Sequence, residues 1–171
     1  MGLFTSFSKW FLPERRPISH VDSATLEELL KAAENSLPNE FLALLVAEDS
    51  SKLSFKTEDL ENVKVITGFH IIPATNVTRK SASIKTQSVP TTETIVGSFH
   101  SHPSGVLKPS QKDKQMFQKY PINIIAGPPF ETTSWVCFDN KATQRDLAKI
   151  TVQNNTISDE WTQELSNLHI D

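Results

Sequence analysis

The sequence has few of the features that anchor a chain covalently or in a membrane. It contains one cysteine, Cys137, so no internal disulfide can form, and this usage is typical of a reducing compartment. No apolar run approaches the roughly 20 residues that a membrane-spanning helix needs, and there is no secretory signal pattern. We therefore expect a cytoplasmic protein and no membrane contact.

Neither sign of charge is in large excess. The 17 lysines and arginines against 20 aspartates and glutamates leave a formal net charge of −3. This balance gives nucleic acid or an anionic membrane no general electrostatic attraction to the chain, so nucleic acid is not expected as a partner. There is no internal repeat and no low-complexity tract. A length of 171 residues then suits one domain that is large enough for its own core.

Helical and strand-like patterns alternate along the chain. Leucines at helical spacing predict a helix from Ser23 to about Asn35, ahead of Pro38. A final helix should begin at Ser158. Elements of both types around one mixed sheet indicate an α/β domain. Apolar or β-branched runs predict strands at Ile18–Val21, Phe41–Ala47, Val63–Ile72, Ser81–Gln87, Thr94–Phe99, Ile122–Ala126, Thr133–Asp139 and Leu147–Val152.

The start of the chain differs from the rest. Large apolar side chains between Leu3 and Phe11 fall near one face of a short helix, and prolines and arginines follow as in a linker. We expect residues 1–17 to form an aromatic arm and linker, and residues 18–171 to form the domain. The arm should pack on its own domain or on a second copy of the chain, which leaves a homodimer open.

The stretch from Gly97 to Asp113 holds the side chains best suited to chemistry. His100 and His102 follow directly on the predicted strand Thr94–Phe99. Because side chains alternate along a strand, the two imidazoles point the same way, roughly 7 Å apart at the backbone. That spacing allows both of them to bind one ion.

A carboxylate on the next element completes this group. A short helix is predicted over Gln111–Tyr120, with Ser110 as its N-cap and Asp113 on the apolar face that Met116 and Phe117 define. Taken alone, Ser110 and Asp113 fit an ordinary capping box. However, an ionised carboxylate that faces the core needs a cationic partner, and no lysine or arginine shares that face. Two histidines at the end of the preceding strand indicate that the partner is a metal.

This combination of His-Ser-His-Pro, six residues, Ser, two residues and Asp resembles the signature of the JAMM (MPN-plus) metalloprotease family. The resemblance covers roughly residues 18–150 and implies a single JAMM/MPN-like domain with a curved mixed β-sheet flanked by helices. It further implies that His100, His102 and Asp113 bind one Zn²⁺ per chain and leave a fourth position open. Ser110 would then help to stabilise the tetrahedral intermediate.

The resemblance also assigns a role to Glu40. From the residues alone, Glu40 is an exposed residue at the start of the strand Phe41–Ala47. The family places a glutamate after its first long helix, at the start of an apolar strand, as the general base. It commonly has glycine three residues later, where this sequence has Ala43. If Phe41–Ala47 lies antiparallel to the strand before His100, Glu40 reaches the same end of the sheet as the histidines.

The activity that the resemblance implies is a zinc-dependent isopeptidase or peptidase, similar to the stand-alone prokaryotic members of the family, particularly the archaeal ones. It would cleave after the C-terminal glycine of a ubiquitin-like modifier and so remove the modifier from protein lysines. The partner would be that modifier or its conjugates, bound by residues that the sequence does not identify. Three alternatives stay open: processing of a ubiquitin-fold sulfur carrier, a non-haem iron enzyme with the same ligand types, and a non-catalytic MPN scaffold. The complete ligand set argues against the last.

Overall fold

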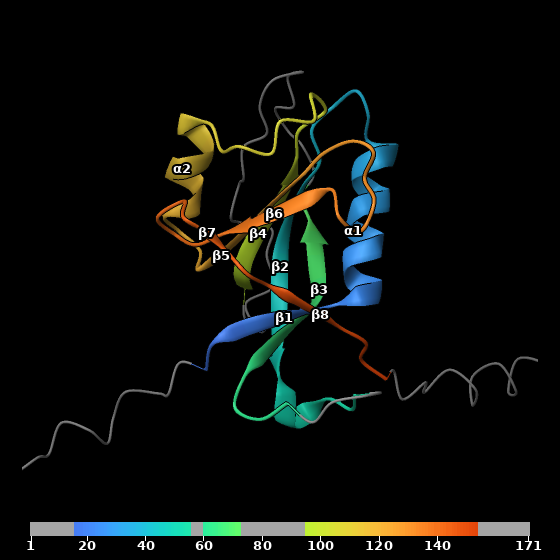
Figure 1. Cartoon of the computed structure of the whole chain (residues 1–171), viewed down its shortest axis with the longest axis vertical. Coiled ribbons are helices and arrows are strands. Elements are labelled where there is room, and N and C mark those ends of the chain that lie inside the picture. The colour runs from blue at the N-terminus through green and yellow to red at the C-terminus, as the bar shows by residue number, and fades with distance from the viewer. Residues whose placement is uncertain (1–15, 56–59, 73–94, 154–171) are drawn as a thin grey trace, which may run out of the picture.

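The computed structural model describes residues 16–55, 60–72 and 95–153. These residues form an eight-stranded sheet in the order β7-β6-β5-β4-β2-β3-β1-β8, with helices on both faces (Figure 1). This confirms the predicted α/β class with a curved mixed sheet flanked by helices. In chain order the elements are β1 (Ile18–Asp22), α1 (Ser23–Asn35), β2 (Leu42–Asp49), a short 3-10 helix (Ser50–Lys52), β3 (Lys64–Ile71), β4 (Ile95–Ser101), α2 (Gln111–Phe117), β5 (Ile122–Ala126), β6 (Trp135–Phe138), β7 (Gln144–Arg145) and β8 (Ala148–Ile150).

The middle of the sheet is built from β4, β2 and β5. β2 runs antiparallel to β4, with Leu42 opposite His100 and Ala43 opposite Phe99. The antiparallel pairing on which the expected position of Glu40 depended is therefore present. β4 runs parallel to β5, and α2 forms the crossover between them. The crossover places α2 directly beyond the end of the strand that carries the first histidine.

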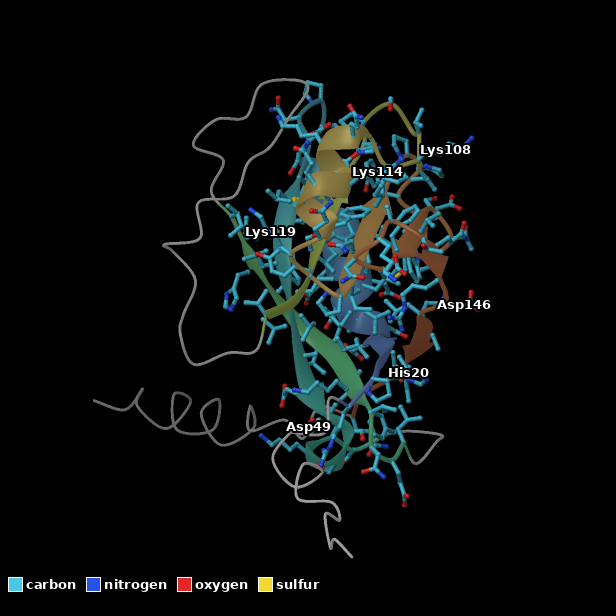
Figure 2. All side chains as sticks on the ribbon, turned by 90° about the vertical axis from the view of Figure 1, so that its left-hand side faces the viewer. His20, Asp49, Lys108, Lys114, Lys119 and Asp146 are labelled. Carbon is cyan, nitrogen blue, oxygen red and sulfur yellow. The ribbon has the colours of Figure 1, made fainter. Side chains whose placement is uncertain are left out.

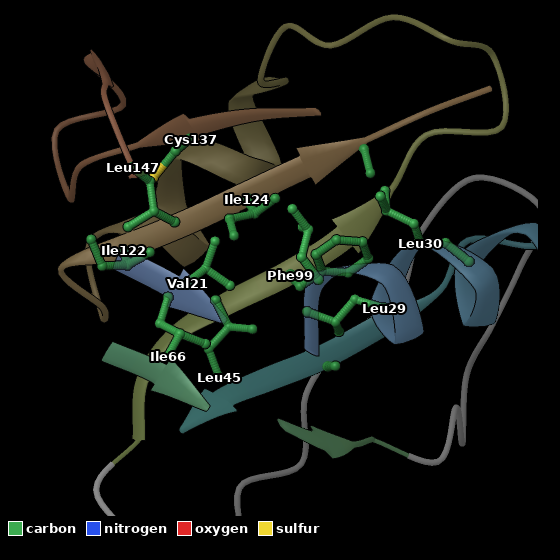
Figure 3. Close-up of a cluster of buried hydrophobic side chains, with 14 of the residues drawn as sticks. Val21, Leu29, Leu30, Leu45, Ile66, Phe99, Ile122, Ile124, Cys137 and Leu147 are labelled. Carbon is green, nitrogen blue, oxygen red and sulfur yellow. The ribbon is translucent and has the colours of Figure 1, made fainter. Parts of the chain in front are cut away.

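The helix α1 covers one face of the sheet. Its N-cap is Asp22, whose carboxylate accepts hydrogen bonds from the Thr25 backbone N–H and the Thr25 hydroxyl, both at 3.1 Å. Its leucines at i, i+3 and i+4 spacing form one apolar stripe. The stripe packs into the main core with side chains of β2, β4 and β5 (Figure 3). The largest contributors from those elements include Leu26, Leu29, Leu30, Leu45, Phe99 and Ile124.

The helix α2 covers the opposite face. Its Phe117 is fully buried and packs with Ile125 of β5 and Phe138 of β6. Its Met116 packs against a second small cluster, formed by Leu42 and Leu44 of β2 with Ile72, which follows β3. Because successive strand residues alternate faces, His100, the partner of Leu42, lies on this α2 face, whereas Phe99 belongs to the α1 face.

Several predicted elements differ from the structure in their ends. α2 stops at Phe117 rather than Tyr120, because the next turn is held by i→i−3 bonds from Lys119 and Tyr120 ahead of Pro121. β7 was not predicted, since two exposed or half-exposed edge residues carry no apolar alternation. The strand predicted at 81–87, the helix from 158 and most of the arm at 1–17 lie outside the described residues.

The single cysteine is a packed core residue. Cys137 is buried in β6, and burial raises the pKa of its thiol to about 11. A thiol with such a pKa stays protonated near neutral pH and is a poor nucleophile. Among the described residues, no helix is both long and apolar enough to cross a membrane.

The close contact between β4 and β5 leads to a stability prediction. A Cβ added at Gly97 would lie 2.5 Å from the Ile122 carbonyl oxygen, so Gly97→Ala must push the two strands apart. We expect a loss of about 1–3 kcal/mol in the free energy of unfolding, measured by denaturant titration. Gly68→Ala in β3 is the control, because its Cβ would meet no atom within 4 Å. Equal losses in the two variants would contradict the argument.

Candidate metal and catalytic site

The two histidines lie where β4 leaves the sheet. His100 is the penultimate residue of β4, and only 4% of it is exposed. The His102 backbone N–H donates to the Ala126 carbonyl at 2.7 Å, so the chain stays alongside β5 for one more step. The predicted alternation is correct, because both imidazoles face α2 and their Nε2 atoms are 3.1 Å apart.

Asp113 in the first turn of α2 meets both histidines. Its Oδ1 lies 3.3 Å from His100 Nε2, and its Oδ2 lies 3.5 Å from His102 Nε2. Within the described part of the chain, these three side chains are the group that can place a ligand atom each within 4.8 Å of the others. The structure therefore brings together the three residues predicted to bind a metal.

The carboxylate of Asp113 also has the capping role that the sequence left as the alternative. Its Oδ2 accepts the Ser110 backbone N–H at 2.6 Å, while the Ser110 hydroxyl accepts the Asp113 N–H at 3.2 Å. Burial alone would raise the pKa of Asp113. The bonds from His100, His102 and Ser110 outweigh it and hold that pKa well below its usual range. The capping box thus orients an ionised carboxylate toward the histidines.

The solvent-exposed side of α2 carries positive charge, opposite in sign to that of Asp113. Lys112, Lys114 and Lys119 are exposed on α2 and the turn after it, and Figure 2 labels the last two. None of them is positioned as an ion-pair partner of Asp113, whose charged neighbours are the two histidines. The prediction that the lysines lie elsewhere on this helix is correct.

The ring of His102 is held by a backbone carbonyl. Its Nδ1 lies 2.6 Å from the Val106 carbonyl oxygen, which requires a hydrogen on Nδ1. Gly105 makes this return possible, because its φ of 75° is strained for any residue with a side chain. Burial opposes the charged form of His102, but its bonds to Asp113 and Val106 prevail and raise its pKa above 6.5. The sequence reasoning missed Val106, since a carbonyl contact leaves no mark on residue type.

This arrangement fits a bound metal ion. With hydrogen on Nδ1, neutral His102 points the lone pair of Nε2 at Asp113 and His100. Electron-rich atoms 3.1–3.5 Å apart repel unless a hydrogen or a metal ion lies among them. Zinc at about 2.0–2.2 Å from tetrahedral N and O ligands sets those ligands about 3.4 Å apart. A carbonyl that accepts from the other ring nitrogen is also the usual support of a metal-binding histidine. His100 is supported differently: its ring packs against Phe117, with centroids 5.9 Å apart.

Glu40 reaches this end of the sheet through the β2–β4 pairing. The Phe41 N–H donates to the Ser101 hydroxyl at 2.8 Å, and the Ser101 N–H donates to the Phe41 carbonyl at 2.9 Å. Continuing the register of Leu42 with His100 sets Glu40 opposite His102. Consistent with this, the Glu40 charge is one of the influences that raise the pKa of His102. Ser101, which points away from the histidines, is a second residue that the sequence reasoning missed.

Comparisons with known proteins relate the chain to JAB-domain metalloproteases. Residues 22–138 match the family model Prok-JAB, described as prokaryotic homologs of the JAB domain. A probable metalloprotease from Haloferax volcanii is 33% identical over 132 residues, which cover 77% of this chain and 80% of that protein.

Solved structures share the fold. A JAB1/MPN domain protein from Archaeoglobus fulgidus has a TM-score of 0.55 at 23% identity, covering 77% of this chain and 98% of that one. A structure described as a JAMM metalloprotease-like zinc site in the proteasome and signalosome has a TM-score of 0.52 at 24% identity, with 77% and 97% covered. A protein from Desulfitobacterium hafniense has a TM-score of 0.57 at 18% identity, with 81% and 97% covered.

The cluster predicts a strict dependence of metal binding on each of its members. His100→Ala, His102→Ala and Asp113→Ala should each lose most of the zinc that the wild-type protein retains after loading and desalting, because a three-ligand site cannot spare one ligand. Zinc is measured by elemental analysis. His20→Ala is the matched control, since His20 lies far below α2 in Figure 2. Wild-type zinc content in any ligand variant would contradict the assignment.

Proposed function

The chain belongs to the Prok-JAB family, the prokaryotic homologs of the JAB domain, and is a metalloprotease of the JAMM type; we propose that it uses one zinc ion to remove a ubiquitin-like modifier from protein lysines. The observation that carries the proposal is the convergence of His100, His102 and Asp113 at the end of β4, with Glu40 across from His102 by strand register. The relative from Haloferax volcanii supports peptide-bond hydrolysis.

The three ligand residues would hold the metal and leave one side of it open to solvent. The His102 and Asp113 side chains are 13% and 15% exposed, so the cluster lies at the rim of the fold rather than in its interior. A bound zinc supplies a Lewis acid for the scissile carbonyl and a water whose pKa is lowered to about 7. The fixed Nδ1–H of His102 and the capped carboxylate of Asp113 keep the donor atoms in place for that ion.

Glu40 would move the proton. The strand register that sets it opposite His102, and the influence of its charge on the pKa of His102, support a position of this carboxylate beside the metal. There it would accept a proton from the attacking water and return it to the lysine amine as the bond breaks. The paired hydrogen bonds between Phe41 and Ser101 fix the backbone next to Glu40, so the base is carried by the sheet itself.

Ser110 would stabilise the oxygen on which charge develops. Its hydroxyl oxygen accepts the Asp113 N–H as the N-cap of α2, which leaves the hydroxyl hydrogen for donation outward. Ser110 is exposed and precedes the ligand Asp113 by one helical turn. A donor in this position would meet the scissile carbonyl oxygen, and one such donor is worth on the order of 3 kcal/mol.

The partial exposure of the cluster supports a chain end as the substrate. With the His102 and Asp113 side chains 13% and 15% exposed, the site does not enclose a small molecule on all sides. A modifier tail that ends in two glycines is thin and extended, so it can reach the cluster while the folded modifier and the modified protein stay outside. An isopeptide bond to lysine gives an amine leaving group that Glu40 can protonate.

Catalysis should separate from metal binding in two variants. Glu40→Gln should keep the fold and zinc but turn over very slowly, because an amide cannot accept the proton of the water. Ser110→Ala should also keep zinc, with a rate loss on the order of a hundredfold from the missing donor. Single-turnover rates and zinc content are measured on the same samples. If Glu40→Gln cleaves at the wild-type rate, the base lies elsewhere.

The substrate proposal is tested with defined conjugates. The zinc-loaded protein should release a ubiquitin-like modifier from lysine on varied partner proteins, and a chelator should abolish the release. A modifier whose terminal Gly-Gly is changed to Ala-Ala should resist cleavage, since added side chains would crowd the approach to the metal. Equal cleavage of both modifiers would indicate a general peptidase. Stoichiometric iron in protein purified without added metal would favour the iron enzyme instead.

A further inference from the structure

We propose that Asn123 and Ser98 are positioning residues of the metal site, which lock the helix that carries Asp113 to the strand that carries the histidines. Neither residue touches the cluster. Both are polar, both are completely buried, and they lie on neighbouring strands. The inference rests on the proposed metal-binding role of the cluster.

The first link joins the two parallel strands. Ser98 on β4 and Asn123 on β5 are register partners, and the Ser98 hydroxyl donates to Asn123 Oδ1 at 2.7 Å. Ser98 precedes His100 by two residues, so both side chains lie on the same face of β4. The amide of Asn123 is thereby oriented by the strand that carries the first histidine.

The second link joins Asn123 to the end of α2. Its Nδ2 donates to the Tyr120 carbonyl at 3.0 Å and lies 3.4 Å from the carbonyls of Phe117 and Asp139. Tyr120 lies in the turn that follows α2, and its own N–H donates to the carbonyl of Phe117, the last residue of the helix, at 3.1 Å. One amide group on β5 therefore holds the turn that ends α2.

These contacts form a closed path of bonded residues that includes the metal site. One side of the path runs along β4 from Ser98 to His100. The other runs through α2 from Asp113 to Phe117, a rise of about 6 Å. The metal cluster joins the two sides at one end, and the Ser98–Asn123 contact joins them at the other. The distance between His100 and Asp113 is thus set by bonds on both ends of a short helix.

Apolar packing alone would hold this helix less specifically. Met116 and Phe117 resist separation of α2 from the sheet, but dispersion and burial have little directional preference along the helix axis. Hydrogen bonds at 2.7 and 3.0 Å to a buried amide do have such a preference. A polar group in this core costs stability unless it is satisfied, and here the hydroxyl and the carbonyls satisfy it.

The test uses the full chain with two variants that break the link. Asn123→Leu keeps the approximate volume and removes the amide, and Ser98→Ala removes one hydroxyl. The zinc dissociation constant is measured by competition with a chromophoric chelator. Amide hydrogen exchange of Asp113–Phe117 is followed in the metal-free protein. Thr25→Val is the control, because it removes a buried hydroxyl contact at the start of α1, on the other face of the sheet.

We expect both link variants to weaken zinc binding about tenfold or more, as for other residues that orient metal ligands without touching the metal. Both should also speed amide hydrogen exchange in α2. Thr25→Val should leave the zinc affinity within about twofold of wild type, whatever its effect on unfolding. If Asn123→Leu does not fold, Ser98→Ala decides.

Unchanged zinc affinity in the folded link variants, or an equal loss in Thr25→Val, would overturn the inference. A wild-type protein that binds no metal would contradict the proposed function itself. In that case the exchange of α2 amides in Ser98→Ala still shows whether the link holds the helix: unchanged exchange refutes the inference, and faster exchange supports it.

Discussion

The structure depends on one electrostatic requirement, the need of the Asp113 carboxylate for positive charge. Two imidazoles meet this carboxylate at 3.3 and 3.5 Å, and their own Nε2 atoms are 3.1 Å apart. Such crowding of donor atoms is unfavourable without a cation, and protons or a metal ion can both supply the charge. A metal satisfies all three groups at once, whereas a proton is shared by only two atoms. The remaining features of the site hold these atoms close in spite of their repulsion.

That support comes from elements with different physical character. His100 lies on β4, a buried strand that runs parallel to β5 as far as the pair Ser101 with Ala126. His102 follows the strand, and its backbone N–H donates to the Ala126 carbonyl. The aspartate sits in the first turn of α2, where the capping box fixes its carboxylate. The crossover from β4 through α2 to β5 is the unit that brings the two parts together. The buried amide of Asn123 ties that unit at its far end.

Much of this was predictable from residue type and spacing. Alternation along β4 correctly placed both imidazoles on one face, and the apolar stripe of α2 correctly turned Asp113 inward. The roles of Val106, Ser101 and Asn123 were not predicted. Val106 acts through its backbone carbonyl, Ser101 bonds to the neighbouring strand, and Asn123 bonds to the turn that ends α2. Such contacts depend on tertiary packing rather than on local sequence pattern. The parallel pairings of β1 with β3 and β8 were hidden for the same reason.

Glu40 shows how far the catalytic arrangement depends on strand register. It does not belong to the β4–α2–β5 unit and reaches the site only because β2 pairs with β4 as Leu42 with His100. A slip of one residue would turn every β2 side chain to the other face, moving Leu42 and Leu44 from the α2 side to the α1 side. Both faces of β2 are buried, so such a slip would disrupt the two cores together. The position of the proposed base is therefore fixed by apolar packing on both sides of β2, the strand that begins two residues after it.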